Sequence, residues 1–513
     1  MHDRGGSTDY FARDRSSSGL RSRAVKGGGA SIIAELISLV IHMAGVVVLG
    51  RLLKPGDFGT VAMVTAFYLL LANFGFNGFT EFIIQKKDLD HAQLSSLFWL
   101  HGTIALVLTL SFAAVAPLLS RFYAETAIER VVRVMSVGIL FRMLSTHHLA
   151  LLQRGMRFGR VAVNTVVARL LSVTLAIAMA CVGCEYWSIV GRQVGEAVFV
   201  AVGAWLMCSW RPGPPAASRG VLEGIRFALH VYGNFTLDYF ARNVDKALLG
   251  HYHGSTTLGN YDRAYYLASM PGQQLVTPLH SVALATLSRL RNEPDKYISY
   301  YRTALSTLCV VGFAASVVLT TSGHDIVTIL LGPGWEQAGA VARAFGPGAG
   351  AMIVYSTFSW FHLSLARPDR WLRWSLFAAA LTAAFIAVAA PFGAVAVATT
   401  YSLSYYVLML PAIWYAARPI GLRIGLLVKT ISPSFTAGAV STLFWLAAKE
   451  IWPATSGSFV GLSVPVRLAV LVPGSVLLYG ILVVCFHRST RPITDLFSLV
   501  RVFLLRDSLS NPV

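Results

Sequence analysis

The chain has 513 residues, of which 55% are hydrophobic and 13% are charged, about half the charged share of an ordinary globular protein. Its mean hydropathy is +0.62, yet 42 Lys and Arg against 24 Asp and Glu give a net charge of +18. These values exclude a string of soluble domains, and no stretch is long enough to form a soluble basic domain that binds nucleic acid. The composition predicts a multi-pass membrane protein.

Apolar stretches of about 20 residues, enough to cross a bilayer as a helix, recur along the whole chain. We predict an all-α fold with about fourteen transmembrane helices. Residues 1–26 lack the apolar run of a signal peptide and are predicted to form a disordered basic cytoplasmic tail. The predicted spans are 27–50, 58–80, 94–120, 131–153, 161–183, 186–209, 226–250, 257–288, 303–323, 338–365, 374–391, 393–416, 428–448 and 466–486. The fourth, seventh, eighth and tenth contain charges or prolines and are less apolar.

The Lys and Arg residues in the loops and tails, counted together with Arg226, Lys429 and Arg467 at the first residues of their spans, are divided unequally between the two sides of the membrane. With the N-terminus in the cytoplasm, cytoplasmic segments hold 28 of them and outer loops hold 6. Short cytoplasmic loops are enriched in these residues, so both termini, including the tail at 488–513, are predicted to be cytoplasmic. The six outer cations are Arg51, Lys54, Arg121, Arg130, Lys449 and Arg467.

The chain contains an internal sequence repeat. GRLLKPGDFGT at 50–60 matches GHYHGSTTLGN at 250–260, and RGMRFGR at 154–160 matches RPDRWLR at 367–373. Six spans separate the copies, so we predict two parallel six-helix lobes around a central cavity. The predicted domains are an N-lobe (27–209), a cytoplasmic linker (210–225), a C-lobe (226–416) and two extra helices (417–487). Chance similarity among apolar helices is the alternative.

The seventh span carries the densest set of charges. A helical period places five polar side chains on one face, namely Asn234, Asp238, Arg242, Asp245 and Lys246. Each charge costs about 2.5–3.5 kcal/mol at the centre of a membrane, so this face has to meet water or charged partners. It is either a cationic cavity wall for an anionic substrate, or a self-neutralised network in which Arg242 pairs with Asp238 and Asp245.

Other spans contain further candidate substrate-binding cations. Arg142 and Arg169 lie in the fourth and fifth spans, with His147 and His148 near the former, and Arg263 begins the eighth. Arg133 and Arg343 begin the fourth and tenth spans and are expected to reach outward to the membrane surface.

Two carboxylates are candidates for coupling transport to H⁺ or Na⁺. These are Glu35 in the first span and Glu196 in the sixth, although Glu196 has the spacing to pair with Arg192 instead. In the polar run at 73–81, Gly75 and Gly78 permit either a bend or close helix packing.

Three short motifs are better explained by structure than by chemistry. Cys181 and Cys184 have CxxC spacing without a second pair, and Asp88 and Asp90 precede a helix whose N-terminus favours acidic residues. The histidines at 251 and 253 show no further ligand. We predict no metal, no cofactor and no catalytic site.

Several segments together resemble one membrane protein family. They are RLLKPGDFG at 51–59, IIQKKDLDHAQLSSLFWL at 83–100, DYFARNVDKALLG at 238–250, LGNYDRAYYLASMP at 258–271 and LLGPGWEQA at 330–338. Their pattern resembles that of bacterial polysaccharide exporters, the Wzx-type flippases of lipid-linked oligosaccharides in the multidrug/oligosaccharidyl-lipid/polysaccharide (MOP) superfamily. Lys246 departs from this pattern, which usually has an amide or a small polar residue there.

This resemblance implies alternating access and a substrate made of an oligosaccharide repeat unit on undecaprenyl diphosphate, turned across the bacterial inner membrane. The expected pathway is that of exopolysaccharide, capsule or O-antigen, with a polymerase and a chain-length regulator as partners. Three alternatives stay open: a lipid II flippase, a multidrug antiporter of the same superfamily, and a membrane polysaccharide polymerase. The antiporter should have an acidic cavity, and the polymerase a large outer loop.

Overall fold

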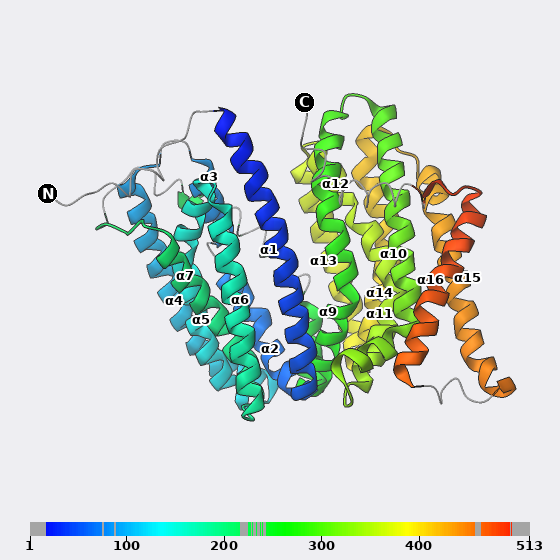
Figure 1. Ribbon diagram of the computed structural model, residues 1–513, viewed down its shortest axis with the longest axis horizontal. Helices are drawn as coiled ribbons and strands as arrows, with labels where there is room; N and C mark the ends of the chain where they lie inside the picture. Colours follow the sequence, from blue (N-terminus) through cyan, green and yellow to red (C-terminus); the bar gives the residue numbers. More distant parts are fainter. Residues whose placement is uncertain are drawn as a thin grey trace. The chain divides into compact units, whose positions relative to one another are not determined.

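The computed structural model describes residues 17–73, 76–86, 89–215, 224–226, 228, 232, 236, 239, 243–456, 463–492 and 494. Within these ranges almost every residue is helical and none lies in a strand (Figure 1). The chain divides into two compact units, unit 1 at residues 1–259 and unit 2 at residues 260–513.

Unit 1 is built from helices that begin and end close to the predicted spans. They are α1 (Ser17–Leu52), α2 (Pro55–Ala72), α3 (Phe76–Gln85), α4 (His91–Tyr123), α5 (Ala127–Arg154), α6 (Phe158–Cys181) and α7 (Trp187–Met207), followed by the first turns of α9 (Val244–Arg289). Helix α5 packs against α4 and α7, and α6 packs between α1 and α7.

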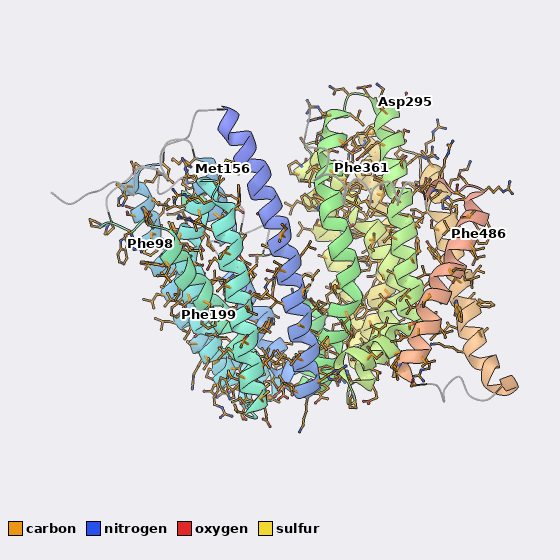
Figure 2. The ribbon with its side chains drawn as sticks, viewed as in Figure 1. Phe98, Met156, Phe199, Asp295, Phe361 and Phe486 are labelled. Atoms are coloured by element: carbon orange, nitrogen blue, oxygen red, sulfur yellow. The ribbon has the colours of Figure 1, made fainter. Side chains whose placement is uncertain are left out.

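Unit 2 contains the remainder of α9 and the helices that follow it. They are α10 (Pro294–Leu331), α11 (Glu336–Ser356), α12 (Phe358–Ser364), α13 (Pro368–Ala389), α14 (Ala394–Ala417), α15 (Ile424–Ser456) and α16 (Val464–His487), with short 3₁₀ turns after α13 and α14. Asp295, at the start of α10, and Phe486, near the end of α16, lie toward the same end of this unit (Figure 2). The α10–α11 connection and the start of α16 therefore lie toward the other end.

Ten helices of the described part of the chain are long and apolar enough to cross a membrane, judged by length and composition. They coincide with ten of the fourteen predicted spans. Helices α5, α9 and α11 occupy the fourth, eighth and tenth predicted spans but are less apolar. Of the 25 residues of the seventh span, 12 that are scattered over 227–242 lie outside the described residues. Large exposed apolar side chains such as Leu110, Leu118 and Leu443 cover the outer surfaces of these helices, as expected for faces that meet lipid. The protein is thus an all-α, multi-pass membrane protein.

Three predicted boundaries differ from the structure. Helix α1 begins at Ser17, so residues 17–26 of the predicted tail are helical. The predicted second span is interrupted after Ala72, and α3 continues it from Phe76. The outer turn predicted before the eighth span is present but tight: at Gly254, with a φ of 73° and a ψ of −175°, the backbone leaves the helical conformation between two helical segments of α9, and this φ suits glycine.

The polar run at 73–81 shows both a bend and close helix packing, the two alternatives that its glycines permit. The helix breaks there, and Gly78 has a φ of 120°. A Cβ atom on Gly78 would also lie 2.7 Å from the Ala228 Cα atom, so the backbones approach closely. Glycine is required at this position for its conformation and for its small size.

The core of unit 2 is rich in aromatic side chains, and the hydroxyl groups of two of its buried tyrosines have hydrogen-bond partners. Tyr297 and Tyr301 are fully buried on α10. Their hydroxyl groups lie 2.6 Å from Ser364 Oγ and 2.9 Å from Thr357 Oγ1, respectively. Because a buried hydroxyl without a partner is costly, these contacts fix α12 against α10.

Candidate functional site

Polar side chains gather among the apolar helices of unit 1. This set, here called the unit 1 polar group, comes from α2, α5, α6 and α7. It comprises Thr65, Tyr68, Asn73, Arg142, Arg169, Gln193 and Glu196.

A hydrogen bond to the end of α2 and close packing between α2 and α5 together set the position of the Arg142 side chain. One of its terminal guanidinium nitrogens donates to Asn73 Oδ1 at 3.1 Å, across the point where α2 ends. One turn earlier on α5, Gly138 leaves space for Tyr68, because a Cβ atom there would lie 2.6 Å from the Tyr68 hydroxyl oxygen. The half-buried Arg142 side chain is thus held beside a break in α2.

Glu196 lies close to Arg169, one of the candidate cations of the sequence. Its carboxylate is 3.7 Å from Arg169 Nε, and the two side chains are 33% and 27% exposed. Glu196 and Arg142 both act electrostatically on the buried Tyr68. The sequence spacing predicts a pair between Glu196 and Arg192, whereas the structure shows an ion pair between Glu196 and Arg169, which lies on α6.

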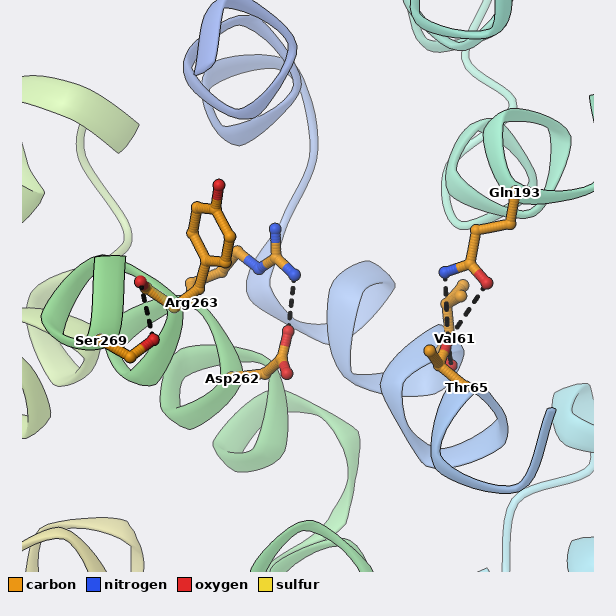
Figure 3. Close-up of polar contacts among 7 residues, drawn as sticks. Val61, Thr65, Gln193, Asp262, Arg263 and Ser269 are labelled. Carbon is orange, nitrogen blue, oxygen red and sulfur yellow. Dashed lines mark hydrogen bonds and ion pairs between the residues drawn. The ribbon is translucent and has the colours of Figure 1, made fainter. Parts of the chain in front are cut away.

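A neutral pair extends the unit 1 polar group along α7. Gln193 lies three residues before Glu196, and its amide nitrogen donates to Thr65 Oγ1 at 3.1 Å (Figure 3). Thr65 in turn donates to the Val61 carbonyl at 2.7 Å. The face of α7 that carries Glu196 is therefore polar over a full turn.

The charged stripe predicted for the seventh span is only partly described. Asn234, Asp238 and Arg242 lie outside the described residues. Asp245 and Lys246 begin α9, where Asp245 is 1% exposed and its Oδ1 accepts from the Lys246 backbone N–H at 2.8 Å. The choice between a cavity wall and a self-neutralised network therefore stays a prediction.

In unit 2, the candidate cation Arg263 is paired. Its guanidinium lies 2.5 Å from Asp262 Oδ2, and both side chains are less than one-fifth exposed (Figure 3). The guanidinium carbon also lies 5.7 Å from the centre of the Tyr266 ring. One turn away, buried Asn260 accepts from the Ala338 backbone N–H at 3.0 Å and thereby caps the start of α11.

A small pocket of unit 2 is walled by aromatic rings. It holds about 270 Å³ that no atom fills, part of it open to the outside. Tyr265, Phe345, Tyr401 and Tyr405 line it from α9, α11 and α14, together with Ser269 and Ser402. The rings of Tyr265, Phe345 and Tyr401 pack edge to face on one another, with centroids 5.5–6.0 Å apart, so this lining is mainly an aromatic cluster of the core.

The structure separates the two carboxylates proposed for ion coupling. Glu196 lies in the unit 1 polar group, whereas Glu35 is exposed on α1. Tyr68, Thr65 and the aromatic pocket were missed from the sequence, because single Tyr and Thr residues in apolar helices are common. The three-residue spacing of Gln193 and Glu196 was the one available signal.

Within the described ranges, no three His, Cys, Asp or Glu side chains come together in a way that fits a metal ion. Cys181 and Cys184, at the end of α6, are free thiols.

The chain resembles known proteins in sequence and in fold. The sequence model of the family described as "Polysaccharide biosynthesis protein" matches residues 48–340, more than half of the chain. The lipopolysaccharide biosynthesis protein WzxC of Escherichia coli (strain K12) is 21% identical over 62% of this chain and 65% of its own length, just under two thirds. The succinoglycan biosynthesis transport protein ExoT of Rhizobium meliloti (strain 1021) is 22% identical over 71% of this chain and 73% of its own.

Among solved structures, the lipid II flippase MurJ in an inward closed conformation aligns with a TM-score of 0.69. The alignment covers 89% of this chain and 98% of that protein at 14% identity. At this identity the likeness concerns the fold alone.

Proposed function

This chain belongs to the family of polysaccharide biosynthesis proteins, and from that premise we propose that it is a lipid-linked oligosaccharide flippase. The substrate is an oligosaccharide repeat unit on undecaprenyl diphosphate, and the protein turns it from the cytoplasmic to the outer leaflet of the bacterial inner membrane. The family match, together with relatives whose names describe polysaccharide biosynthesis and transport, is the observation that carries this proposal.

The physical task explains why such a substrate needs a protein. Its diphosphate and sugar hydroxyls would lose their hydration in hydrocarbon, at a cost of several kcal/mol for each unsatisfied polar group. A flippase therefore has to replace water with polar and charged side chains inside the membrane. The isoprenoid tail has no such need, since it is as apolar as the surrounding lipid.

The unit 1 polar group supports this role. Among the described side chains of this group, Arg142 and Arg169 are two cations beside one carboxylate, Glu196. Arginine binds phosphate oxygens through two parallel N–H donors, so a half-buried Arg142 suits a diphosphate. We propose that Glu196 couples the transport cycle to H⁺ or Na⁺, because binding a proton or a cation would weaken its ion pair with Arg169. No bond of the substrate is made or broken in this account.

The same chemistry suits lipid II, which carries a diphosphate on the same kind of lipid, and this is the second candidate. The fold shared with MurJ favours it, whereas the family match and the printed names of WzxC and ExoT favour the repeat units of an exported polysaccharide. We further propose that both termini are cytoplasmic, and that a polymerase and a chain-length regulator act on the delivered product.

Deletion of the gene tests this function. The cell should lose its exported polysaccharide while lipid-linked repeat units accumulate on the inner leaflet. Normal polymer output in a strain without a second flippase of this family would refute the proposal. Arrest of peptidoglycan synthesis with normal polysaccharide would assign the protein to lipid II instead.

A further inference from the structure

A charged cluster joins four helices of unit 2 at the end where α10 meets α11. It comprises Asp325 on α10, Arg343 on α11, Lys449 on α15 and Arg467 on α16, here called the α10–α16 cluster. A terminal guanidinium nitrogen of Arg467 lies 2.7 Å from Asp325 Oδ1. The Lys449 ammonium donates to the backbone carbonyl of Thr321, one turn earlier on α10.

Close backbone packing brings Arg343 into the same cluster. A Cβ atom on Gly323 would lie 3.5 Å from the Arg343 Cα atom, so α10 and α11 touch two residues before Asp325. Asp325, Arg343 and Arg467 are the charges that act on the Lys449 ammonium. Lys449 and Arg467, which were predicted to lie in outer loops, are thus on helices and reach α10.

The described side chains of the cluster carry three positive charges and one negative charge. The single carboxylate is already engaged, because Asp325 is bound by Arg467 and lies 3.9 Å from the His324 ring. The nearby Glu336 is exposed and accepts from the Gly334 backbone N–H. Two cationic charges therefore exceed what Asp325 can balance.

Burial makes this excess significant. The side chain of Asp325 is 9% exposed and that of Arg467 is 20% exposed. The Nε atom of Arg467 is buried without a hydrogen-bond partner. A guanidinium that keeps an unused donor beside two further cations is arranged to receive an anion with several acceptor oxygens.

The surface next to the cluster indicates where such an anion comes from. One to two turns further into α15, Leu443 and Phe444 are 67% and 54% exposed. On α16, Val466 and Val470 flank Arg467 and are each 45% exposed. Helices α15 and α16 are both apolar enough to span a membrane, so this surface meets acyl chains while the cluster lies at headgroup level.

We propose that the α10–α16 cluster binds the phosphate of an anionic phospholipid, whose acyl chains lie along α15 and α16. The lipid phosphate balances the excess charge and receives donors from Arg343, Lys449 and Arg467. With both termini in the cytoplasm, the lipid belongs to the outer leaflet. The site is independent of the transported substrate, and it ties α15 and α16 to α10 through a lipid.

Native mass spectrometry of the purified, delipidated full-length protein tests this site, with phosphatidylglycerol as the probe and phosphatidylcholine as the zwitterionic comparison. Wild-type protein should bind phosphatidylglycerol more tightly. Neutralising the cluster with Asp325→Asn, Lys449→Gln and Arg467→Gln together should weaken that binding by about tenfold or more, since charge-assisted hydrogen bonds are lost without stranding a carboxylate. Arg133→Gln, at an exposed arginine of α5 paired with Glu129, is the matched control and should change nothing.

Two single variants distinguish a lipid-binding site from a salt-bridge network that only holds the helices together. Asp325→Asn removes the carboxylate that competes with the lipid phosphate, so a lipid site predicts tighter binding of phosphatidylglycerol. A purely internal salt-bridge network predicts lower thermal stability and no increase in affinity for phosphatidylglycerol. Arg343→Gln alters an exposed side chain that packing does not need, and should weaken binding several-fold. Equal affinity of the wild-type and neutralised proteins for phosphatidylglycerol, or equal affinity of wild-type protein for the two lipids, would overturn the proposal.

Discussion

Gly59 and Ser255 lie so close together that a Cβ atom on Gly59 would sit 1.7 Å from the Ser255 carbonyl oxygen. The reverse contact is also present, since a Cβ atom on Gly259 would lie 1.8 Å from the Pro55 carbonyl oxygen. In the internal repeat, Gly59 aligns with Gly259 and Pro55 aligns with Ser255. A reciprocal contact of this kind is what a two-fold relation between repeated segments produces.

Gly59→Ala and Gly259→Ala should each destabilise the protein, and by similar amounts. The added methyl group has no space, and overpacking of this kind costs about 1–3 kcal/mol. Thermal unfolding of the detergent-purified protein should show a lower midpoint for both variants. Gly102→Ala is the matched control, because a Cβ atom there meets nothing within 4 Å. Unchanged midpoints for Gly59→Ala and Gly259→Ala would show that these backbones are not in contact.

Arg142→Ala should lower flipping by roughly ten- to a hundredfold while the protein still accumulates in the membrane, since a hydrogen bond to a charged group contributes about 1.5–3 kcal/mol. Arg142→Lys should keep partial activity, because lysine retains the positive charge but cannot form the bidentate hydrogen bonds of arginine to a phosphate. Polymer output and membrane abundance are measured together. Arg133→Ala should leave both unchanged. Full activity of Arg142→Ala would remove this residue from the substrate path.

The stripe of the seventh span yields two opposed forecasts for Arg242. If Arg242 binds the diphosphate, the triple variant Arg242→Ala/Asp238→Asn/Asp245→Asn should reach normal membrane abundance and fail to export. If the stripe is only a neutralised network, Arg242→Ala alone should misfold through its stranded carboxylates, and the triple variant should regain export. Export assays and immunoblots of the membrane fraction decide between them.

Reporter fusions test the orientation that the cation distribution predicts. Fusions after residues 54, 253 and 332 should be periplasmic, and fusions after residues 158 and 215 should be cytoplasmic. The α10–α11 connection, beside the proposed lipid site, would then face the periplasm. A reversed result at any one position would mean that a span has been miscounted before it.

The sequence predicted the helices well because lipid imposes a simple rule on them. The uncharged run at 94–120, for example, became α4, which extends only a few residues beyond it at each end. The prediction was weaker where charge or glycine interrupts an apolar run. Helix α2 ends at Ala72, where the polar run follows it, and the turn expected before the eighth span is tighter than predicted, with Gly254 joining two helical segments of α9.

The sequence predicted individual residues of the candidate site but not which of them lie together. Charges in apolar spans identified Arg142, Arg169 and Glu196, since each is costly without a function or a partner. Their association was not predictable, because the helices that carry Arg169 and Glu196 meet only in the packed unit. Asp325 was missed for a similar reason. Its partners Lys449 and Arg467 lie more than a hundred residues away and looked like ordinary loop cations.

Reconstitution into liposomes measures lipid flipping by the protein alone. Purified protein is placed in liposomes that contain an undecaprenyl-diphosphate-linked oligosaccharide, and the fraction open to a membrane-impermeant sugar-cleaving enzyme is followed over time. We expect the accessible fraction to rise beyond the outward-facing half when wild-type protein is present, and not when Arg142→Ala protein is present at equal amount. An accessible fraction identical to that of protein-free liposomes, with correctly folded wild-type protein, would contradict the assignment as a flippase.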